Sequence, residues 1–178
     1  MFSGKSDELL RRLSRLKYAK RNHLLFKPER DTRTSALARS RTGTQLQALT
    51  FATFADLLEL VHAQDGHDDV RPVIGIDEVQ FAPRNGVETV ITTLMRRGHD
   101  VHIAGLDLTF KGEPFETTAA LLAMAHKVIK LNAYCSVCGQ DAHYSQLLVL
   151  DGVDDNHIKV GDSEYSARCL AHFTPPGT

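Results

Sequence analysis

Several features are scarce in this chain of 178 residues, and each scarcity excludes a class of protein. Three cysteines are too few for a disulfide framework, and an odd number cannot all be paired within the chain. The formal net charge is only -1, so no global basic field indicates nucleic acid binding. No apolar run approaches the roughly 18–20 residues of a membrane span, and the polar N-terminus lacks the apolar core of a signal peptide. We therefore expect an intracellular, cytoplasmic protein with reduced thiols.

Hydrophobic residues make up 42% of the chain, enough for the core of one domain with a small appendage. The apolar patterns predict helices at 6–21, 53–63, 87–98 and 117–131, strands at 23–27, 73–77 and 101–107, and a polar loop over 31–45. Strands 73–77 and 101–107 are apolar enough to be buried on both faces. The alternation of strand and helix predicts an α/β domain over residues 1–131, with a mostly parallel sheet. Residues 132–178 contain short strand-like pieces and all three cysteines, and they form a second, smaller lobe.

The opening residues, MFSGKSDELL, end like a phosphate-binding loop. Gly4, Lys5 and Ser6 match the last three positions of G-x-x-x-x-G-K-[ST]. In such a loop backbone N–H groups hold phosphate oxygens, the lysine reaches the β- and γ-phosphates, and the serine holds Mg²⁺. The first glycine of the pattern would fall two residues before Met1. Taken alone, the match is therefore also compatible with a chance turn that opens a helix.

The stretch VIGIDEVQF places two carboxylates at the end of a buried strand. Asp77 fits the acidic partner that holds Mg²⁺ beside a phosphate-binding loop, and Glu78 follows where a base could face an attacking group. The carboxyl ends of strands are where α/β sheets bind ligands. The alternative is that both carboxylates simply end a strand at the surface.

The cysteines fall into a metal-binding pattern. CSVC (135–138) and CLAH (169–172) give a Cys₃His set, which is a standard closed tetrahedral zinc site. The set is Cys135, Cys138, Cys169 and His172. His143 and His157 are rival fourth ligands without the two-residue spacing, and buried free thiols are the alternative to any metal. A closed site leaves no position for water, so we predict a structural zinc ion.

In their order along the chain, these motifs resemble the type II thymidine kinases. The stretches that carry the resemblance run from residue 1 to 172: MFSGKS, LKYAKR with FKPERDTR, GIDEVQF, AGLDLTFKGEPF, LLAMAHKVIKLNAYCSVCG and EYSARCLAH. The resemblance implies a P-loop (RecA-like) α/β fold with helices on both faces of the sheet and a zinc-ribbon-like lasso lobe. It also implies transfer of the ATP γ-phosphoryl group to the 5′-hydroxyl of thymidine or deoxyuridine in nucleotide salvage, and a homotetramer.

The family's functional residues map onto this chain one by one. The resemblance implies Glu78 as general base, and ATP and Mg²⁺ contacts at Ser3, Gly4, Lys5, Ser6, Asp31, Arg33, Asp77 and Gln80. It implies nucleoside contacts at Met1, Phe81, Leu106, Phe110, Phe115, Ser145, Ile158, Val160, Gly161 and Tyr165. For the phenylalanines the alternative is ordinary core. Ser145 departs from the usual threonine near the thymine methyl group, which leaves the choice of pyrimidine open.

The resemblance also implies that the family's first strand, in the middle of its sheet, and the first half of its phosphate loop have no counterpart here. We expect a truncated fragment or a start codon assigned too late, and a lineage that has dispensed with the strand is the alternative.

Two other classes of protein share some of these features. A RecA-like ATPase or switch module also pairs a phosphate loop with Asp-Glu, but activates water without a nucleoside. A zinc-ribbon nucleic acid binder would need a basic lobe, whereas residues 132–172 hold two basic residues (Lys159 and Arg168) against six acidic ones (Asp141, Asp151, Asp154, Asp155, Asp162 and Glu164). That balance disfavours a nucleic acid partner.

Overall fold

A parallel sheet forms the centre of the molecule. The computed structural model describes residues 1–31, 37–39, 43–64, 70–148 and 164–175. The sheet has four parallel strands in the order β4-β1-β5-β6: β4 (Leu49–Phe51), β1 (His23–Pro28), β5 (Val73–Ile76) and β6 (Val101–Ile103). The mostly parallel sheet predicted from the sequence is confirmed.

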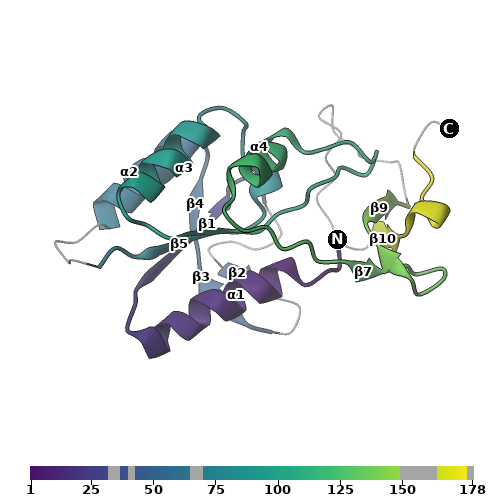
Figure 1. Cartoon of the computed structure of the whole chain (residues 1–178), viewed down its shortest axis with the longest axis horizontal. Coiled ribbons are helices and arrows are strands. Elements are labelled where there is room, and N and C mark those ends of the chain that lie inside the picture. The colour runs from purple at the N-terminus through teal and green to yellow at the C-terminus, as the bar shows by residue number, and fades with distance from the viewer. Residues whose placement is uncertain (32–36, 40–42, 65–69, 149–163, 176–178) are drawn as a thin grey trace.

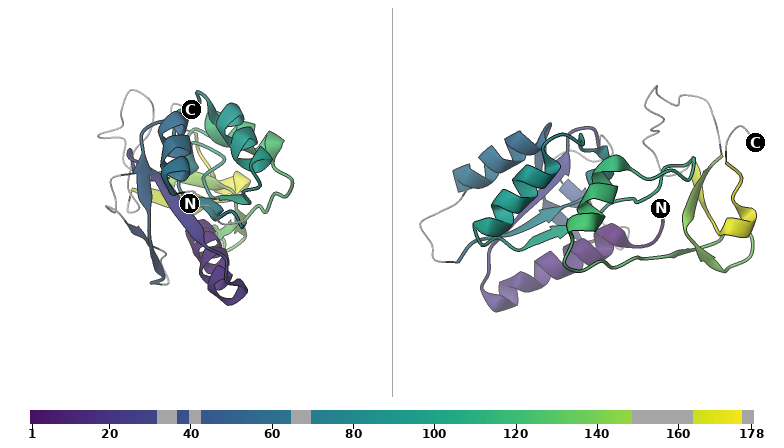
Figure 2. Two further views of the ribbon diagram at one scale, coloured as in Figure 1. Left: turned by 90° about the vertical axis from the view of Figure 1, so that its left-hand side faces the viewer. Right: turned by 45° about the horizontal axis from the view of Figure 1, so that its top comes forward.

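Helices cover both faces of this sheet, as predicted. They are α1 (Lys5–Arg15), α2 (Phe54–Gln64), α3 (Val87–Arg96) and α4 (Glu116–Met124). Figure 1 shows α1 on one face and the other three on the opposite face, and the turned views of Figure 2 agree. Among the described residues, none of the helices is long and apolar enough to cross a membrane.

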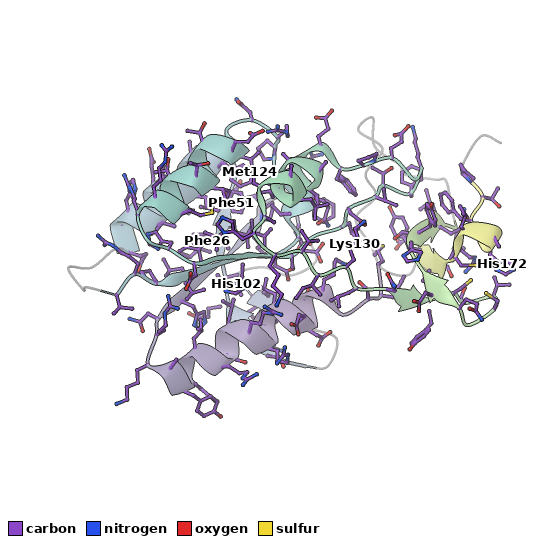
Figure 3. The ribbon with its side chains drawn as sticks, in the orientation of Figure 1. Phe26, Phe51, His102, Met124, Lys130 and His172 are labelled. Atoms are coloured by element: carbon purple, nitrogen blue, oxygen red, sulfur yellow. The ribbon has the colours of Figure 1, made fainter. Side chains whose placement is uncertain are left out.

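The larger core lies between the sheet and α2, α3 and α4. Phe26 and Ile76 from the sheet pack with Leu57 of α2 and Leu94 of α3, and all four side chains are fully buried. Figure 3 labels Phe26 and Phe51 within this layer. Burial of each such side chain contributes about 1.5–3 kcal/mol. This packing holds β1 and β5 side by side, with Phe26 opposite Ile76.

A second core cluster lies under α1. Leu10 and Leu13 of α1 are fully buried against Leu25 and Val73. Helix and sheet approach closely at Gly75, where a Cβ atom would lie 2.5 Å from Leu13 Cδ1. The contact holds α1 against β5, and these two elements lie next to the motif residues Gly4, Lys5 and Ser6 and the carboxylates Asp77 and Glu78.

Short antiparallel pairs form the C-terminal lobe, on the right in Figure 1. They are β7 (Ala133–Tyr134) with β8 (Asp141–Ala142), and β9 (Tyr144–Leu147) with β10 (Tyr165–Arg168), followed by a 3₁₀ turn at Leu170–His172. The backbone N–H of Ser136 donates to the carbonyl of Ala167, so the two halves of the lobe are joined.

Four elements differ from the sequence prediction. The helix predicted over 6–21 ends as an α-helix at Arg15, and a 3₁₀ turn (Leu16–Ala19) follows it. The helix predicted over 117–131 ends at Met124, because the apolar residues beyond it find no buried face: Val128 and Ile129 are 47% and 45% exposed. The predicted loop over 31–45 contains β2 (Leu37–Arg39), which pairs with β3 (Gln45–Gln47). The strand predicted over 101–107 ends at Ile103 and is half-buried, because within the described residues only β5 pairs with it.

Candidate active site and metal centre

The predicted phosphate loop lies at the N-terminus of α1. Gly4 caps the helix with φ 77° and ψ 23°, a left-handed conformation that favours glycine. The carbonyl of Gly4 accepts from the N–H of Glu8, so Lys5 and Ser6 occupy the first helical turn. The N–H groups of that turn have no partners within the helix and form an environment suited to phosphate. Ser3 and Met1 precede it in the same loop.

Asp77 lies directly beside this loop. It follows β5, whose four residues are all buried, and its N–H donates to the carbonyl of Phe26. The hydroxyl of Ser6 donates to Asp77 Oδ1 over 3.1 Å. The structure therefore joins the serine of the phosphate-loop motif to the acid of the strand motif, although they are 71 positions apart in the sequence. A hydroxyl and a carboxylate oxygen are both ligands that suit Mg²⁺.

The Asp77 carboxyl is only 5% exposed, and its ionisation is perturbed. Burial is the main reason that its pKa rises from 3.8 to about 7, and the charge of Glu78 adds to the rise. Hydrogen bonds from the Ser6 hydroxyl and the Glu78 N–H, and the charge of Lys5, lower the pKa of Asp77 in part. A cation placed here would therefore compensate a buried acid, which is consistent with a metal-binding role.

Glu78 has an unusual backbone conformation. Its φ of 53° and ψ of 37° are left-handed values that cost a residue with a Cβ about 1 kcal/mol or more. Its N–H donates to Asp77 Oδ1 over 3.0 Å, and a 3₁₀ turn (Val79–Phe81) follows it. β5 therefore ends before Glu78, and the backbone turns sharply at that residue.

Gln80 fixes the Glu78 side chain. Its amide nitrogen donates to Glu78 Oε2 over 2.6 Å, and its amide oxygen accepts from the N–H of Leu106 over 3.0 Å. Gln80 is 4% exposed, and Gly105 leaves room for its amide, because a Cβ there would lie 3.0 Å from Gln80 Oε1. The structure thus places Gln80, which was predicted among the ATP and Mg²⁺ contacts, between Glu78 and the segment after β6.

A buried lysine was not singled out from the sequence. Lys27 of β1 is 2% exposed, and its Nζ lies 3.6 Å from Asp31 Oδ2 and donates to the Asp31 carbonyl. Asp31, a predicted ATP-site residue, is 6% exposed. The available signal was a lysine inside an apolar strand, since lysine is almost never fully buried unless it is paired. Arg33, which was predicted together with Asp31 as an ATP-site residue, lies outside the described residues.

Four apolar residues were predicted to surround the nucleoside. Phe81 and Phe110 are 7% and 6% exposed, whereas Leu106 and Phe115 are half-buried. Within the described part of the chain, neither Phe81 nor Phe110 belongs to the hydrophobic clusters of the sheet and helices. The N–H of Phe115 donates to the carbonyl of Asp107, and the Thr117 hydroxyl donates to the carbonyl of Ala82. These bonds tie the start of α4 to the segments after β5 and β6.

The C-terminal lobe also contacts the phosphate loop. The Met1 amino group donates to Ser145 Oγ over 2.8 Å, and Ser145 is 5% exposed on β9. Tyr165 begins β10, opposite Leu147. Two predicted nucleoside contacts, Met1 and Ser145, therefore lie together. Three further predicted contacts, Ile158, Val160 and Gly161, lie outside the described residues.

The predicted metal ligands converge at the far end of this lobe, where Figure 3 labels His172. The ligand atoms of Cys135, Cys138, Cys169 and His172 all lie within 4.8 Å of one another. The Cys138 and Cys169 sulfurs are 3.7 Å apart, and His172 Nδ1 is 3.2 Å from Cys169 Sγ and 3.8 Å from Cys135 Sγ. His143 is not part of this cluster, and His157 lies outside the described residues.

The chemistry of this cluster fits zinc. Burial raises the pKa of Cys135, but backbone N–H groups of Cys169, Val137 and Cys138 outweigh it and lower that pKa to about 6. Metal binding requires the thiolate form. The turn that follows Cys135 is closed by two backbone hydrogen bonds: the Cys135 N–H donates to the Gln140 carbonyl, and the Gly139 N–H donates to the Cys135 carbonyl. Gly139 has φ 73°. Three sulfurs and one imidazole nitrogen make a closed tetrahedral set.

A parallel α/β sheet in which a G-K-S motif at the start of a helix meets an acid at the end of a buried strand is the arrangement of P-loop proteins. A family model described as thymidine kinase matches residues 1–173. The chain belongs to the thymidine kinase family, and it is therefore a kinase that uses ATP.

Curated relatives agree with the family model. A thymidine kinase of Ureaplasma urealyticum serovar 10 is 44% identical over 181 residues, which covers 99% of this chain and 80% of the relative. One from Ureaplasma parvum serovar 3 is 42% identical with the same coverage. One from Mycoplasma genitalium is 41% identical over 175 residues, covering 98% of this chain and 79% of the relative.

Proposed function

We propose that this chain transfers the γ-phosphoryl group of ATP to the 5′-hydroxyl of thymidine or deoxyuridine. The observation that carries the proposal is the hydrogen bond of 3.1 Å between Ser6 and Asp77, with Glu78 as the next residue. It unites the phosphate loop, the acid and the candidate base in one place, in a chain of the thymidine kinase family.

The loop and Asp77 would bind the nucleotide. The N–H groups at the start of α1 would face the phosphates, and Lys5, the first residue of that helix, would supply a positive charge next to them. Ser6 Oγ and the ionised Asp77 carboxylate would hold Mg²⁺, which when bound neutralises phosphate charge and orients the β- and γ-phosphates. The buried contact with Lys27 would hold Asp31 in place for nucleotide binding.

Glu78 would accept the proton of the nucleoside hydroxyl. β5 ends before Glu78, where the backbone turns sharply, and Gln80 holds the Glu78 carboxylate through a hydrogen bond of 2.6 Å. Because phosphoryl transfer depends mainly on positioning and charge stabilisation, a base in a fixed position supplies only part of the acceleration.

The nucleoside would lie between the phosphate loop and the C-terminal lobe. Phe81 and Phe110 offer buried apolar surface outside the main core, and Ser145 lies beside Met1. The zinc site would be structural, because its four ligands leave no open position. A cytoplasmic location and a homotetrameric assembly are part of the same proposal, and the resemblance to the family supports them.

Product analysis tests this function directly. Purified protein, ATP, Mg²⁺ and thymidine are incubated, and the nucleotides are separated by chromatography. We expect thymidine 5′-monophosphate and ADP in equal amounts, with little ADP when thymidine is omitted. Deoxyuridine in place of thymidine shows how strictly the base is selected. ATP hydrolysis that is independent of nucleoside would instead establish the ATPase alternative, which no comparison favours.

A further inference from the structure

Phe173 immediately follows the last predicted metal ligand and makes an aromatic contact. Its ring stacks on that of Tyr144 in β9, with centroids 4.4 Å apart and an interplanar angle of 15°. Both rings are half-buried. An offset aromatic stack at this distance is a favourable packing arrangement.

The residue after Phe173 is held just as firmly. The N–H of Thr174 donates to Gln146 Oε1 over 2.8 Å, and its carbonyl accepts from Gln146 Nε2 over 3.0 Å. Gln146 and Tyr144 are two positions apart on β9, so they share one face of that strand. Phe173 is therefore fixed from both sides, by His172 before it and by Thr174 after it.

The Phe173 ring rests on a glycine of the other lobe. Gly112 has φ +83°, and a Cβ atom there would lie 3.3 Å from Phe173 Cε1 and 3.7 Å from Tyr144 Cε1. Both aromatic side chains thus pack closely against the backbone of Gly112. In Figure 1 the segment between β6 and α4, which contains this glycine, extends towards β9 and β10.

Gly112 belongs to a tight turn, residues 108–114, that carries Phe110. An antiparallel bridge joins Leu108 to Pro114, the N–H of Thr109 donates to the Glu113 carbonyl over 2.8 Å, and the N–H of Gly112 donates to the Thr109 carbonyl over 3.0 Å. Phe110 is 6% exposed. A shift of Gly112 would move the whole turn, and with it the Phe110 ring.

We propose that Phe173 is a positioning residue for nucleoside binding, because its contact with Gly112 lets the C-terminal lobe hold the 108–114 turn, and with it Phe110, in place. The proposal rests on the function proposed above, in which Phe110 contacts the nucleoside. It assigns a role to a side chain beyond the Cys₃His motif. It also gives the metal a consequence outside its own lobe, since His172 anchors the residue next to it.

Substitution of Phe173 separates positioning from general stability. Phe173→Ala should raise KM for thymidine about three- to tenfold, in keeping with the worth of an aromatic pair, with little change in KM for ATP or in zinc content. Phe173→Tyr should behave like the wild type. Leu170→Ala is the matched control, because Leu170 lies in the same lobe but is 72% exposed. Phe173→Leu keeps apolar bulk, should fold if the alanine variant does not, and should shift the thymidine KM in the same direction.

Hydrogen exchange gives a second reading that needs no activity. In the protein without nucleoside, Phe173→Ala or removal of zinc should speed exchange at the amides of Thr109 and Gly112, while amides of α2 stay unchanged. If the wild type exchanges as expected but makes no thymidine monophosphate, the proposed function fails and the coupling stands. Unchanged exchange at these two amides together with an unchanged thymidine KM overturns the coupling.

Discussion

Asp77 is a buried acid whose ionisation opposes folding. Its pKa of about 7 in the folded chain lies above the ordinary value of 3.8. Between these two values the unfolded chain has lost the proton that the folded chain keeps, so the free energy of unfolding falls as the pH rises from about 4 to about 7. Above pH 7 this contribution stays constant.

Asp77→Asn should remove that penalty. Without Mg²⁺, the variant should match the wild type in stability near pH 4 and exceed it at pH 8 by up to about 4 kcal/mol. Chemical denaturation across this pH range measures the difference, and Glu59→Gln on the exposed face of α2 serves as the control. A difference that does not change with pH would contradict the perturbed pKa of Asp77.

Lys27 is a buried base that pairs with a buried acid, Asp31. Lys27→Met leaves Asp31 as a buried acid without its lysine, so the free energy of unfolding should fall by about 3–5 kcal/mol. The double variant Lys27→Met with Asp31→Leu should recover much of this loss, because it removes both charges. Lys127→Met, at an exposed position, is the control. Equal stability of wild type and Lys27→Met would show that the pair contributes nothing.

At the residue scale, spacing predicted which cysteines and which histidine would lie together. The pattern of Cys135, Cys138, Cys169 and His172 is a known coordination set, and the structure brings their ligand atoms together as predicted. The link from Gln80 to Leu106 was not predictable, because it joins segments 26 residues apart through an amide whose partner depends on packing. Lys27 was missed because a lysine near the end of an apolar strand is normally exposed.

At the scale of elements, the C-terminal lobe has the smallest core, and its Cys₃His cluster is compatible with zinc. Its strands have two to four residues each, and its buried cluster consists of small side chains: Ala133, Cys135, Ala142 and Ala167. So small a core supplies little hydrophobic stabilisation. Zinc binding is therefore expected to contribute to the folding of the lobe directly.

Cys138→Ser should lower zinc content from about one ion per chain and loosen β9 and β10. Atomic emission gives the metal content, and hydrogen exchange at the amides of β9 gives the order of the lobe. Val137→Ala is a suitable control, since Val137 precedes Cys138 in the sequence and its side chain is 57% exposed. A wild type that carries no zinc and remains fully ordered would rule out the metal centre.

Elements whose character is decided locally were predicted well, and those decided by neighbours were not. VIGI is apolar throughout and forms the buried strand β5, and α1 follows its leucine spacing. The stretch after Met124 has helix-like spacing, but its apolar residues meet no partner and the helix stops. The hairpin of β2 and β3 has no apolar pattern that would predict it. Its place depends on the pairing of the two strands and on packing in the cluster under α1.

At the scale of the whole molecule, the alternation of strand and helix predicted the parallel sheet, whereas the outer edge of β6 was not foreseen. Within the described residues β6 pairs only with β5. Further along the chain, after α4, the side chains of Val128, Ile129 and Leu131 are exposed. An added N-terminal strand that ends in Gly-Pro would complete the G-x-x-x-x-G-K-S pattern and supply further phosphate-binding N–H groups.

Such an extension should raise the affinity for ATP at least about tenfold, which corresponds to about 1.4 kcal/mol. Calorimetric titration of the chain with and without the extension measures the gain. The same extension ending in Val-Pro is the control, because valine does not tolerate the glycine conformation. Equal ATP affinity of the chain and its extended form would show that Gly4, Lys5 and Ser6 bind phosphate without further help.

We propose that Glu78 accepts the proton of a nucleoside hydroxyl next to the loop in which Ser6 bonds Asp77. The most direct test is the rate of phosphoryl transfer to thymidine by Glu78→Gln, which keeps the size of the side chain but removes the proton acceptor. We expect kcat to fall by about 10²–10⁴-fold, with the KM values for ATP and thymidine changed little and Glu59→Gln at the wild-type rate. A Glu78→Gln variant that keeps more than about half of the wild-type kcat, far above the loss expected for a base, would contradict the account.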